Sequence, residues 1–199
     1  MCKRGMYFNA DMVRAVLYDS KTQTRRVVNG VPSTHNFHGG ILISTRVKDE
    51  GKACWAVGIS PLLTNPIRVR CPFSEVGDRL WVRETFAVHG NSDHYAIHYR
   101  ANHTAHVELK DMGYRPSIHI TRWASRITLE ITGVRVERST SINDEDAAAE
   151  RYRAEHSIDG LTHDAWLWFR NLWDGIYSDN SIKANPWVWI IEFKRVEAD

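Results

Sequence analysis

The stretch Lys21-Thr22-Gln23-Thr24-Arg25-Arg26 brings one ammonium, two hydroxyls and two guanidiniums into six residues that contain no acid. Its β-branched threonines predict a strand, in which odd-numbered side chains face one way and even-numbered ones the other. The turn before the strand allows Lys21 to swing toward the threonine side. An amine beside a hydroxyl and an arginine suits anion binding or hydroxyl activation. A solvated basic edge strand is the alternative.

Periodicity and turn residues around this stretch predict an α+β fold. A helix with Asn9 as its N-cap precedes the stretch, and Gly133 within a long strand predicts a β-bulge. Residues 29–66, rich in glycine, proline and small polar residues, predict an excursion from the centre of the fold. The order of elements favours a mostly antiparallel or mixed sheet curled into a small barrel. We expect helices over 10–18, about 143–153 and about 162–175, and strands over 67–70, 79–86, 95–100, 127–138 and 187–196.

Regularly spaced aromatic and aliphatic residues predict which faces are buried. The third helix carries one such stripe, formed by Trp166, Phe169, Trp173 and Ile176. The last strand carries the other, formed by Trp187, Trp189, Ile191 and Phe193.

The 199 residues suffice for one globular domain with a sizeable core, because 43% of them are hydrophobic and only 25% are charged. No apolar run approaches the roughly 20 residues that a membrane-spanning helix needs. The N-terminus has no apolar signal region, so we expect no secretion. The three cysteines, Cys2, Cys54 and Cys71, are widely spaced and odd in number. They indicate reduced thiols in a cytoplasmic protein, with no disulfide-linked partner and no structural zinc.

Charge is unevenly distributed, although the formal net charge of +2 does not itself demand a nucleic-acid partner. Arg115, Arg122 and Arg126 lie in an acid-free stretch, and the excess of arginine over lysine favours bidentate contacts with phosphate. Trp123, between two of these arginines, is the best candidate for stacking on a base.

Several common catalytic motifs are absent from the sequence. It contains no P-loop, no dinucleotide-binding glycine motif and no Gly-x-Ser-x-Gly. The histidine pairs 94/98 and 103/106 fall in regions predicted as strand and loop, so the two-histidine helix of metalloproteases is absent as well. We therefore predict neither a metal ion nor another cofactor.

Two glutamates are candidates for burial. Glu150 follows three alanines, and such small side chains allow a helix to approach another element closely. A solvated helix face is the alternative for Glu150. Glu84 lies in a predicted strand, where we expect it to pair with Arg83 or with a neighbouring strand.

Taken together, these segments resemble the ASCH (activating-signal-cointegrator homology) family of the PUA-like superfamily. The whole chain is similar to the larger ASCH-like proteins carried by bacteriophages and prophages. The latter share the runs Arg115-Pro116-Ser117-Ile118-His119 and Arg122-Trp123-Ala124-Ser125-Arg126. Resemblance to the family as a whole lies in residues 20–26, the turn and strand 77–84, the strand 127–138, the helix with Ala149-Glu150, and the end strand 189–193.

The resemblance implies a single PUA-like domain, with a mixed, mostly antiparallel β-barrel flanked by about three helices. Insertions relative to the small family members lie near residues 29–75, 87–121 and 154–186. A cleft associated with nucleosides or RNA is implied too. Its binding residues would come from the arginine-rich segments, namely Arg25, Arg26, Arg115, His119, Arg122, Trp123 and Arg126.

One small bacterial branch of the family hydrolyses N4-acetylcytidine with a lysine, a threonine and a glutamate. Lys21 and Thr24 match its Lys-x-x-Thr motif, and Glu150 matches the glutamate by position. The implied catalytic roles are Thr24 as nucleophile, Lys21 as base and Glu150 as proton shuttle. An RNA-binding module, a metal-dependent ribonuclease and a protein-interaction role remain alternatives, and the oligomeric state stays open.

Overall fold

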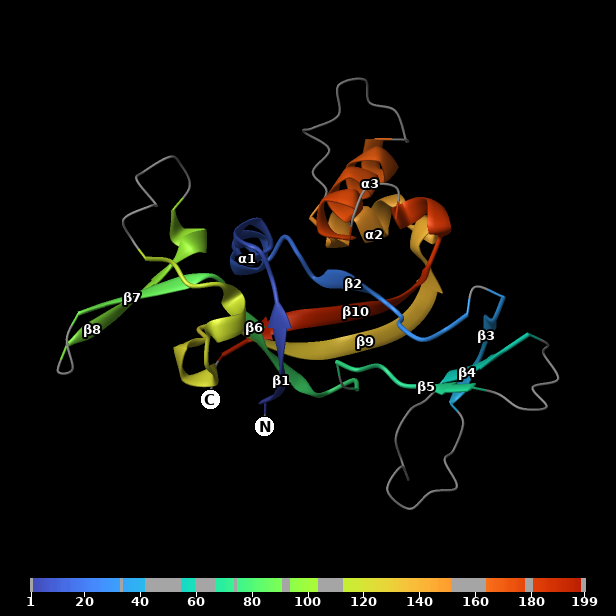
Figure 1. Ribbon diagram of the computed structural model, residues 1–199, viewed down its shortest axis with the longest axis horizontal. Coiled ribbons are helices and arrows are strands. Elements are labelled where there is room, and N and C mark those ends of the chain that lie inside the picture. Colours follow the sequence, from blue (N-terminus) through green and yellow to red (C-terminus); the bar gives the residue numbers. More distant parts are fainter. Residues whose placement is uncertain are drawn as a thin grey trace, which may run out of the picture.

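The computed structural model describes residues 2–32, 34–41, 55–59, 67–73, 75–90, 94–103, 113–151, 164–177 and 181–197. Its centre is a five-stranded mixed sheet with the order β1-β6-β9-β10-β2 (Figure 1). β1 runs parallel to β6, and the other neighbouring strands are antiparallel. The strands are β1 (Cys2–Tyr7), β2 (Gln23–Val27), β6 (Arg79–Arg83), β9 (Thr128–Arg138) and β10 (Trp187–Val196).

The predicted α+β class and mixed sheet are confirmed, but the described strands do not close into a barrel. β1 and β2 are the two edges of the sheet. β2 begins at Gln23, so Lys21 lies in the turn before the strand instead of within it. The basic stretch therefore lies on an edge strand, with its lysine outside the regular strand alternation.

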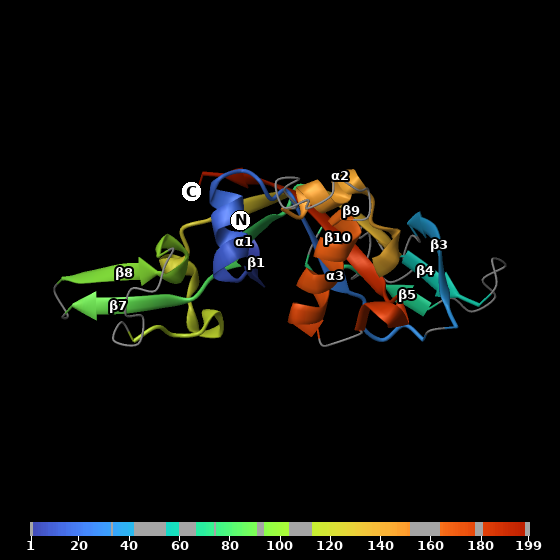
Figure 2. The ribbon, with the colours of Figure 1, turned by 90° about the horizontal axis from the view of Figure 1, so that it is seen from above.

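Two smaller sheets extend from this centre on opposite sides (Figures 1 and 2). One has three strands, β3 (Asn36–Ile41), β4 (Trp55–Gly58) and β5 (Ile67–Val69). The other is a hairpin of β7 (Phe86–Gly90) and β8 (Tyr95–Tyr99). They fall in or next to the regions 29–75 and 87–121, which the family resemblance implies to be insertions.

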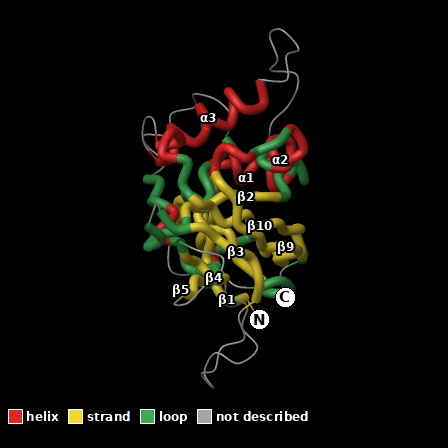
Figure 3. The backbone as a smooth tube through the Cα atoms, turned by 90° about the vertical axis from the view of Figure 1, so that its right-hand side faces the viewer, coloured by secondary structure: helices red, strands yellow, loops and turns green. Residues whose placement is uncertain are grey.

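Three helices lie on one side of the molecule, next to the β2 edge of the central sheet (Figures 1 and 3). They are α1 (Ala10–Leu17), α2 (Asp144–Ala149) and α3 (Asp164–Tyr177). The predicted cap of α1 is confirmed, because the Asn9 side chain accepts the Met12 N–H at 2.8 Å. α2 is shorter than predicted, since Glu150 is its C-cap and Arg151 has a φ of 103°.

The two faces of β10 build two hydrophobic clusters. Trp189, Ile191 and Phe193 pack into the main core with residues of α1, β6 and β9, which confirms the predicted buried face of this strand. Val188 and Ile190 face the other way, against Phe169 and Trp173 of α3. The predicted stripe on α3 holds for these two aromatic residues. It fails for Ile176, which is 42% exposed at the end of the helix.

Two further elements differ from those predicted, and one predicted irregularity is present. β1 was not predicted, and the strand expected over 79–86 is divided into β6 and β7 around Glu84 and Thr85. The bulge predicted at Gly133 is confirmed. Gly133 pairs with Glu192 and Ile131 with Phe193, so one extra residue of β9 lies between consecutive β10 partners.

None of the described helices has the length and apolar character needed to cross a membrane. Among the described residues, Cys71 forms no disulfide.

Candidate functional site

The end of α2 docks on the beginning of β2. The Thr22 N–H donates to the Ala149 carbonyl oxygen at 3.0 Å, and Ala147 is completely buried. The small alanine side chains allow this close approach, as the sequence suggested. The contact places Glu150, the C-cap of α2, beside Lys21.

Lys21 and Glu150 form a buried ion pair. Lys21 Nζ lies 2.5 Å from Glu150 Oε2, and the two side chains are 0% and 3% exposed. The same Nζ also donates to the Glu150 carbonyl oxygen at 3.3 Å. Burying two ionisable groups is costly unless they are paired and hydrogen-bonded, so each partner is what makes the other tolerable in the interior.

Further charges extend this pair into a network. Arg25 Nη1 lies 3.7 Å from Glu150 Oε1, and Arg25 Nη2 lies 2.9 Å from Asp146 Oδ2. Arg135 Nη2 then approaches Asp146 Oδ1 at 2.6 Å. Charges thus alternate in sign from Lys21 through to Arg135, across β2, α2 and β9.

Burial is the dominant influence on Lys21. It lowers the pKa of the Lys21 ammonium below its ordinary value of 10.5, and the carboxylate of Glu150 opposes it by raising that pKa. The nearby guanidiniums of Arg26 and Arg25 lower the pKa further. The neutral amine, which is the form that can accept a proton, therefore forms at a lower pH than it does in a solvated lysine.

Thr24 and Glu150 border a common cavity. Thr24 is 2% exposed and lines this cavity of about 10 Å³ together with Arg25, Glu150 and Phe169. The volume of this cavity is close to the minimum that one water molecule requires. The threonine, the glutamate and the neighbouring arginine thus share one enclosed space.

Several polar atoms around this cavity lack hydrogen bonds. Among the described residues, Arg25 Nε, Nη1 and Nη2 and Glu150 Oε1 are buried without a partner of hydrogen-bonding geometry. The short Arg25–Asp146 distance is therefore a charge contact with unfavourable angles. Buried polar atoms without partners are uncommon in native proteins, and these atoms belong to two residues that line the cavity.

A larger cleft lies next to the small cavity. It has a volume of about 540 Å³ and is lined by residues of α1 and α3, with Ser20 and Arg151. Leu172 of α3 borders both this cleft and the small cavity. Leu172 is therefore common to the linings of the small cavity and of a space of nucleoside size.

The second group of predicted binding residues lies elsewhere. Figures 1 and 2 place the segment with Arg115 and Arg126 near the β7–β8 hairpin, with α1 between it and α2. Arg126 is engaged there by Glu84, with Nε–Oε1 and Nη2–Oε2 distances of 2.9 Å. Glu84 thus has the ion pair that we expected, although with a residue preceding β9 instead of with Arg83.

The remaining predicted residues differ in their accessibility. Trp123 is 63% exposed, and its ring meets that of Tyr95 edge-on at 5.7 Å. Arg122 donates to the Thr128 hydroxyl at 3.2 Å, and Arg115 pairs with Phe86 through its backbone. His119 ends a short turn, Ser117–His119, next to this segment.

Arg26 of β2 lies close to the enclosed cavity and lines it. Its Nη2 donates to the Tyr7 carbonyl oxygen at 2.7 Å, and its guanidinium lies 5.7 Å from the centre of the Phe8 ring. The structure therefore brings together Lys21, Thr24, Arg25, Arg26 and Glu150, and separates them from the arginine–tryptophan segment.

Sequence reasoning missed Asp146 and Arg135 as members of the charged network. Asp146 is one of three acids in the first turn of α2, where a carboxylate favours the helix dipole even without a side-chain partner. Its side chain instead contacts two arginines from different strands. No local sequence pattern predicts contacts between residues so far apart in the chain.

Among the described residues, no group of three or more histidines, cysteines or acids is arranged to hold a metal ion. Comparison of the chain with family models, curated proteins and solved structures gives no match.

Proposed function

We propose that this protein is an amidohydrolase of the ASCH type that removes the acyl group from N4-acylated cytidine, with Lys21, Thr24 and Glu150 as its catalytic residues. One observation carries the proposal: the buried Lys21–Glu150 pair, with an Nζ–Oε2 distance of 2.5 Å, beside the cavity that Thr24 lines. The mixed sheet supports the α+β architecture that the proposal requires, although the described strands do not form the closed barrel expected of a PUA-like domain.

The proposed first step is attack by Thr24 on the acyl carbonyl carbon. A threonine hydroxyl is a weak nucleophile unless a base takes its proton. Lys21 in its neutral form supplies that base, and burial lowers the pKa of Lys21 in the direction that this role needs. The proton then moves from Lys21 to Glu150 along their short contact.

Glu150 delivers this proton to the N4 atom as the carbon–nitrogen bond breaks and cytidine leaves. A water molecule then attacks the acyl-threonine, releases the carboxylic acid and restores the hydroxyl. The developing oxyanion needs positive donors. Arg25 is better suited than Arg26, because its buried nitrogens lack hydrogen bonds whereas Arg26 already donates to Tyr7.

Substrate entry requires the enclosed cavity to enlarge. Ligand sites of nucleoside size begin at about 300 Å³, far above the cavity of about 10 Å³ beside Thr24. The cleft of about 540 Å³ beyond Leu172 has the needed size. We infer that the nucleoside enters from this cleft and displaces the Leu172 side chain.

The decisive experiment is incubation of the purified protein with N4-acetylcytidine and related N4-acylcytidines, followed by chromatography. We expect the wild type to release cytidine, and Lys21→Met, Thr24→Val and Glu150→Gln to release none. Thr22→Val is the matched control, because Thr22 is exposed and two residues from Thr24. Unchanged turnover in Thr24→Val, or no release by the wild type, would contradict the proposal.

A second candidate function is RNA binding by the hairpin side of the molecule. The exposed Trp123 and Tyr95, at 63% and 58%, favour it, because unpaired bases stack on accessible aromatic rings. RNA binding should weaken steeply as salt rises, whereas turnover of an uncharged nucleoside should not.

A further inference from the structure

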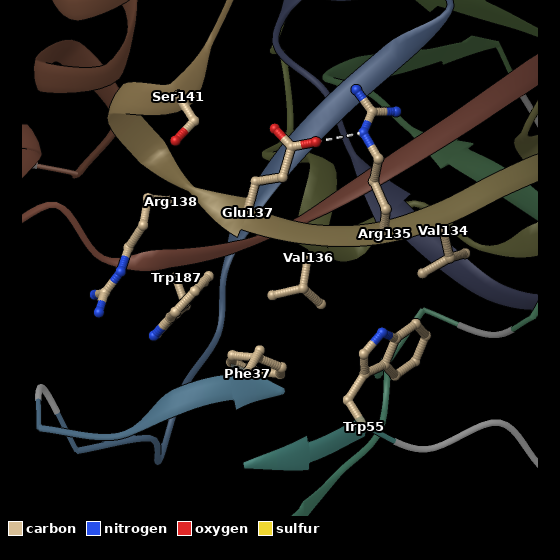
Figure 4. A pocket seen from close by; sticks show the side chains of 9 residues that line it. All are labelled: Phe37, Trp55, Val134, Arg135, Val136, Glu137, Arg138, Ser141 and Trp187. Carbon is tan, nitrogen blue, oxygen red and sulfur yellow. Dashed lines mark hydrogen bonds and ion pairs between the residues drawn. The ribbon is translucent and has the colours of Figure 1, made fainter. Parts of the chain in front are cut away.

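A third, open pocket lies along β9, and its lining includes Arg135 and Glu137 of that strand. It has a volume of about 520 Å³ and lies between β9 and the β3–β4 strands (Figure 4). Val134 and Val136 point into it from β9, facing Phe37 and Trp55 (Figure 4). The pocket is far larger than the cavity beside Thr24 and shares none of its lining residues.

Aromatic rings form the walls of this pocket. The rings of Phe37 and Trp187 meet at 62° with 5.0 Å between their centres. Trp55 meets the buried Trp189 at 71° and 4.8 Å. Edge-to-face contacts of this kind fix ring orientation. The rings of Phe37, Trp55 and Trp187 are thus held in place while part of each stays accessible.

Arg138 supplies the charge at one end of the pocket. Its guanidinium lies 4.1 Å from the centre of the Trp187 ring and donates to the Asn185 carbonyl oxygen at 3.1 Å and to Asn36 Oδ1 at 3.3 Å. Within the described part of the chain, no carboxylate forms an ion pair with Arg138. The other two charged residues of the lining, Arg135 and Glu137, point away from the aromatic rings and pair with each other at 2.8 Å (Figure 4).

We propose that this pocket binds a nucleotide, with the base against Trp55 and Phe37 and the phosphate on Arg138. The aromatic walls suit a flat ring, the fixed guanidinium suits a phosphate, and the volume fits one nucleotide. The ligand is either a free mononucleotide or one nucleotide of a single-stranded RNA. The proposal does not depend on amidohydrolase activity, because the two sites have separate residues.

Two binding measurements test the proposal: isothermal titration with cytidine, CMP and AMP, and fluorescence anisotropy with a labelled oligouridylate. Together they distinguish a free mononucleotide from single-stranded RNA as the ligand. We expect CMP or the oligonucleotide to bind, and cytidine to bind at least about tenfold more weakly than CMP, because charge-assisted hydrogen bonds to the phosphate are lost. Binding of the oligonucleotide without binding of CMP or AMP would identify RNA as the source.

Two pocket variants locate the binding. Arg138→Gln should weaken it by about tenfold or more, because the phosphate loses its charged donor. Ser141→Trp, at an exposed position of the rim, should block it by filling the mouth. Arg170→Gln, on a residue outside the pocket, is the control and should bind as the wild type does. The proposal is overturned if CMP, AMP and the oligonucleotide all fail to bind, or if folded Arg138→Gln and Ser141→Trp bind as tightly as the wild type.

Discussion

At the scale of single residues, the Lys21–Glu150 pair makes a prediction about stability. Glu150→Gln leaves the ammonium of Lys21 buried without a carboxylate, and breaking a buried pair in this way costs about 3–5 kcal/mol. The double variant Lys21→Met/Glu150→Leu removes both charges and should recover most of this loss. Urea unfolding of the two variants measures the effect. A double variant less stable than Glu150→Gln would contradict this account.

The same lysine predicts how activity depends on pH. If neutral Lys21 is the base, kcat/KM rises with pH as the ammonium loses its proton. Burial lowers the pKa of Lys21, so the rising limb should lie below the ordinary lysine value of 10.5. A pH–rate profile with N4-acetylcytidine measures it, with tryptophan fluorescence to confirm that the protein stays folded. A profile that is flat, or that rises only at 10.5 or above, would argue against Lys21 as the base.

At the scale of elements, α3 lines both the cavity beside Thr24 and the larger cleft. Leu172→Ala should join the enclosed cavity to the neighbouring cleft, since Leu172 borders both. We expect kcat/KM for N4-acetylcytidine to rise several-fold, with a modest loss of stability because Leu172 is only half-buried. Leu167→Ala on the same helix is the control, because Leu167 is 45% exposed and lines neither space. No difference between the two variants would place the entrance elsewhere.

Elements with a strong local signal were predictable from the sequence. α1 has its cap and apolar stripe, and β10 has strict alternation, so both match their expected ranges closely. β1 has no such signal and forms by parallel pairing with β6. Its Gly5 lies against Trp81 so closely that an added Cβ would be 2.9 Å from the ring. Only the tertiary neighbour explains that glycine.

Some residues of the candidate site could be suggested from the sequence, whereas the other members of its charged network could not. The resemblance to the ASCH family, through its Lys-x-x-Thr motif, and the alanines before Glu150 suggested three residues, which the fold places close together. Asp146 and Arg135 joined them only through contacts between distant strands and α2. The enclosing role of α3 was equally hidden, because its aromatic stripe indicates burial without indicating what it covers.

At the scale of the whole molecule, β2, which carries Thr24, and the segment before β9, which carries Trp123, lie on different sides of α1 (Figures 1 and 2). Their functions should therefore respond to different substitutions. Trp123→Ala should weaken binding of single-stranded RNA by about tenfold, because one stacked base contributes about 1–3 kcal/mol. The same change should leave turnover of free N4-acetylcytidine unaltered.

Thr24→Val should do the reverse, abolishing turnover while RNA binding persists. Ile59→Ala is the control for loss of an exposed apolar side chain, since Ile59 is 71% exposed. Anisotropy of labelled RNA and chromatography of the nucleoside reaction, on the same protein preparations, measure both properties. If Trp123→Ala lowered nucleoside turnover as much as RNA binding, the two surfaces would act as one site, and the separation that the fold imposes would have no functional meaning.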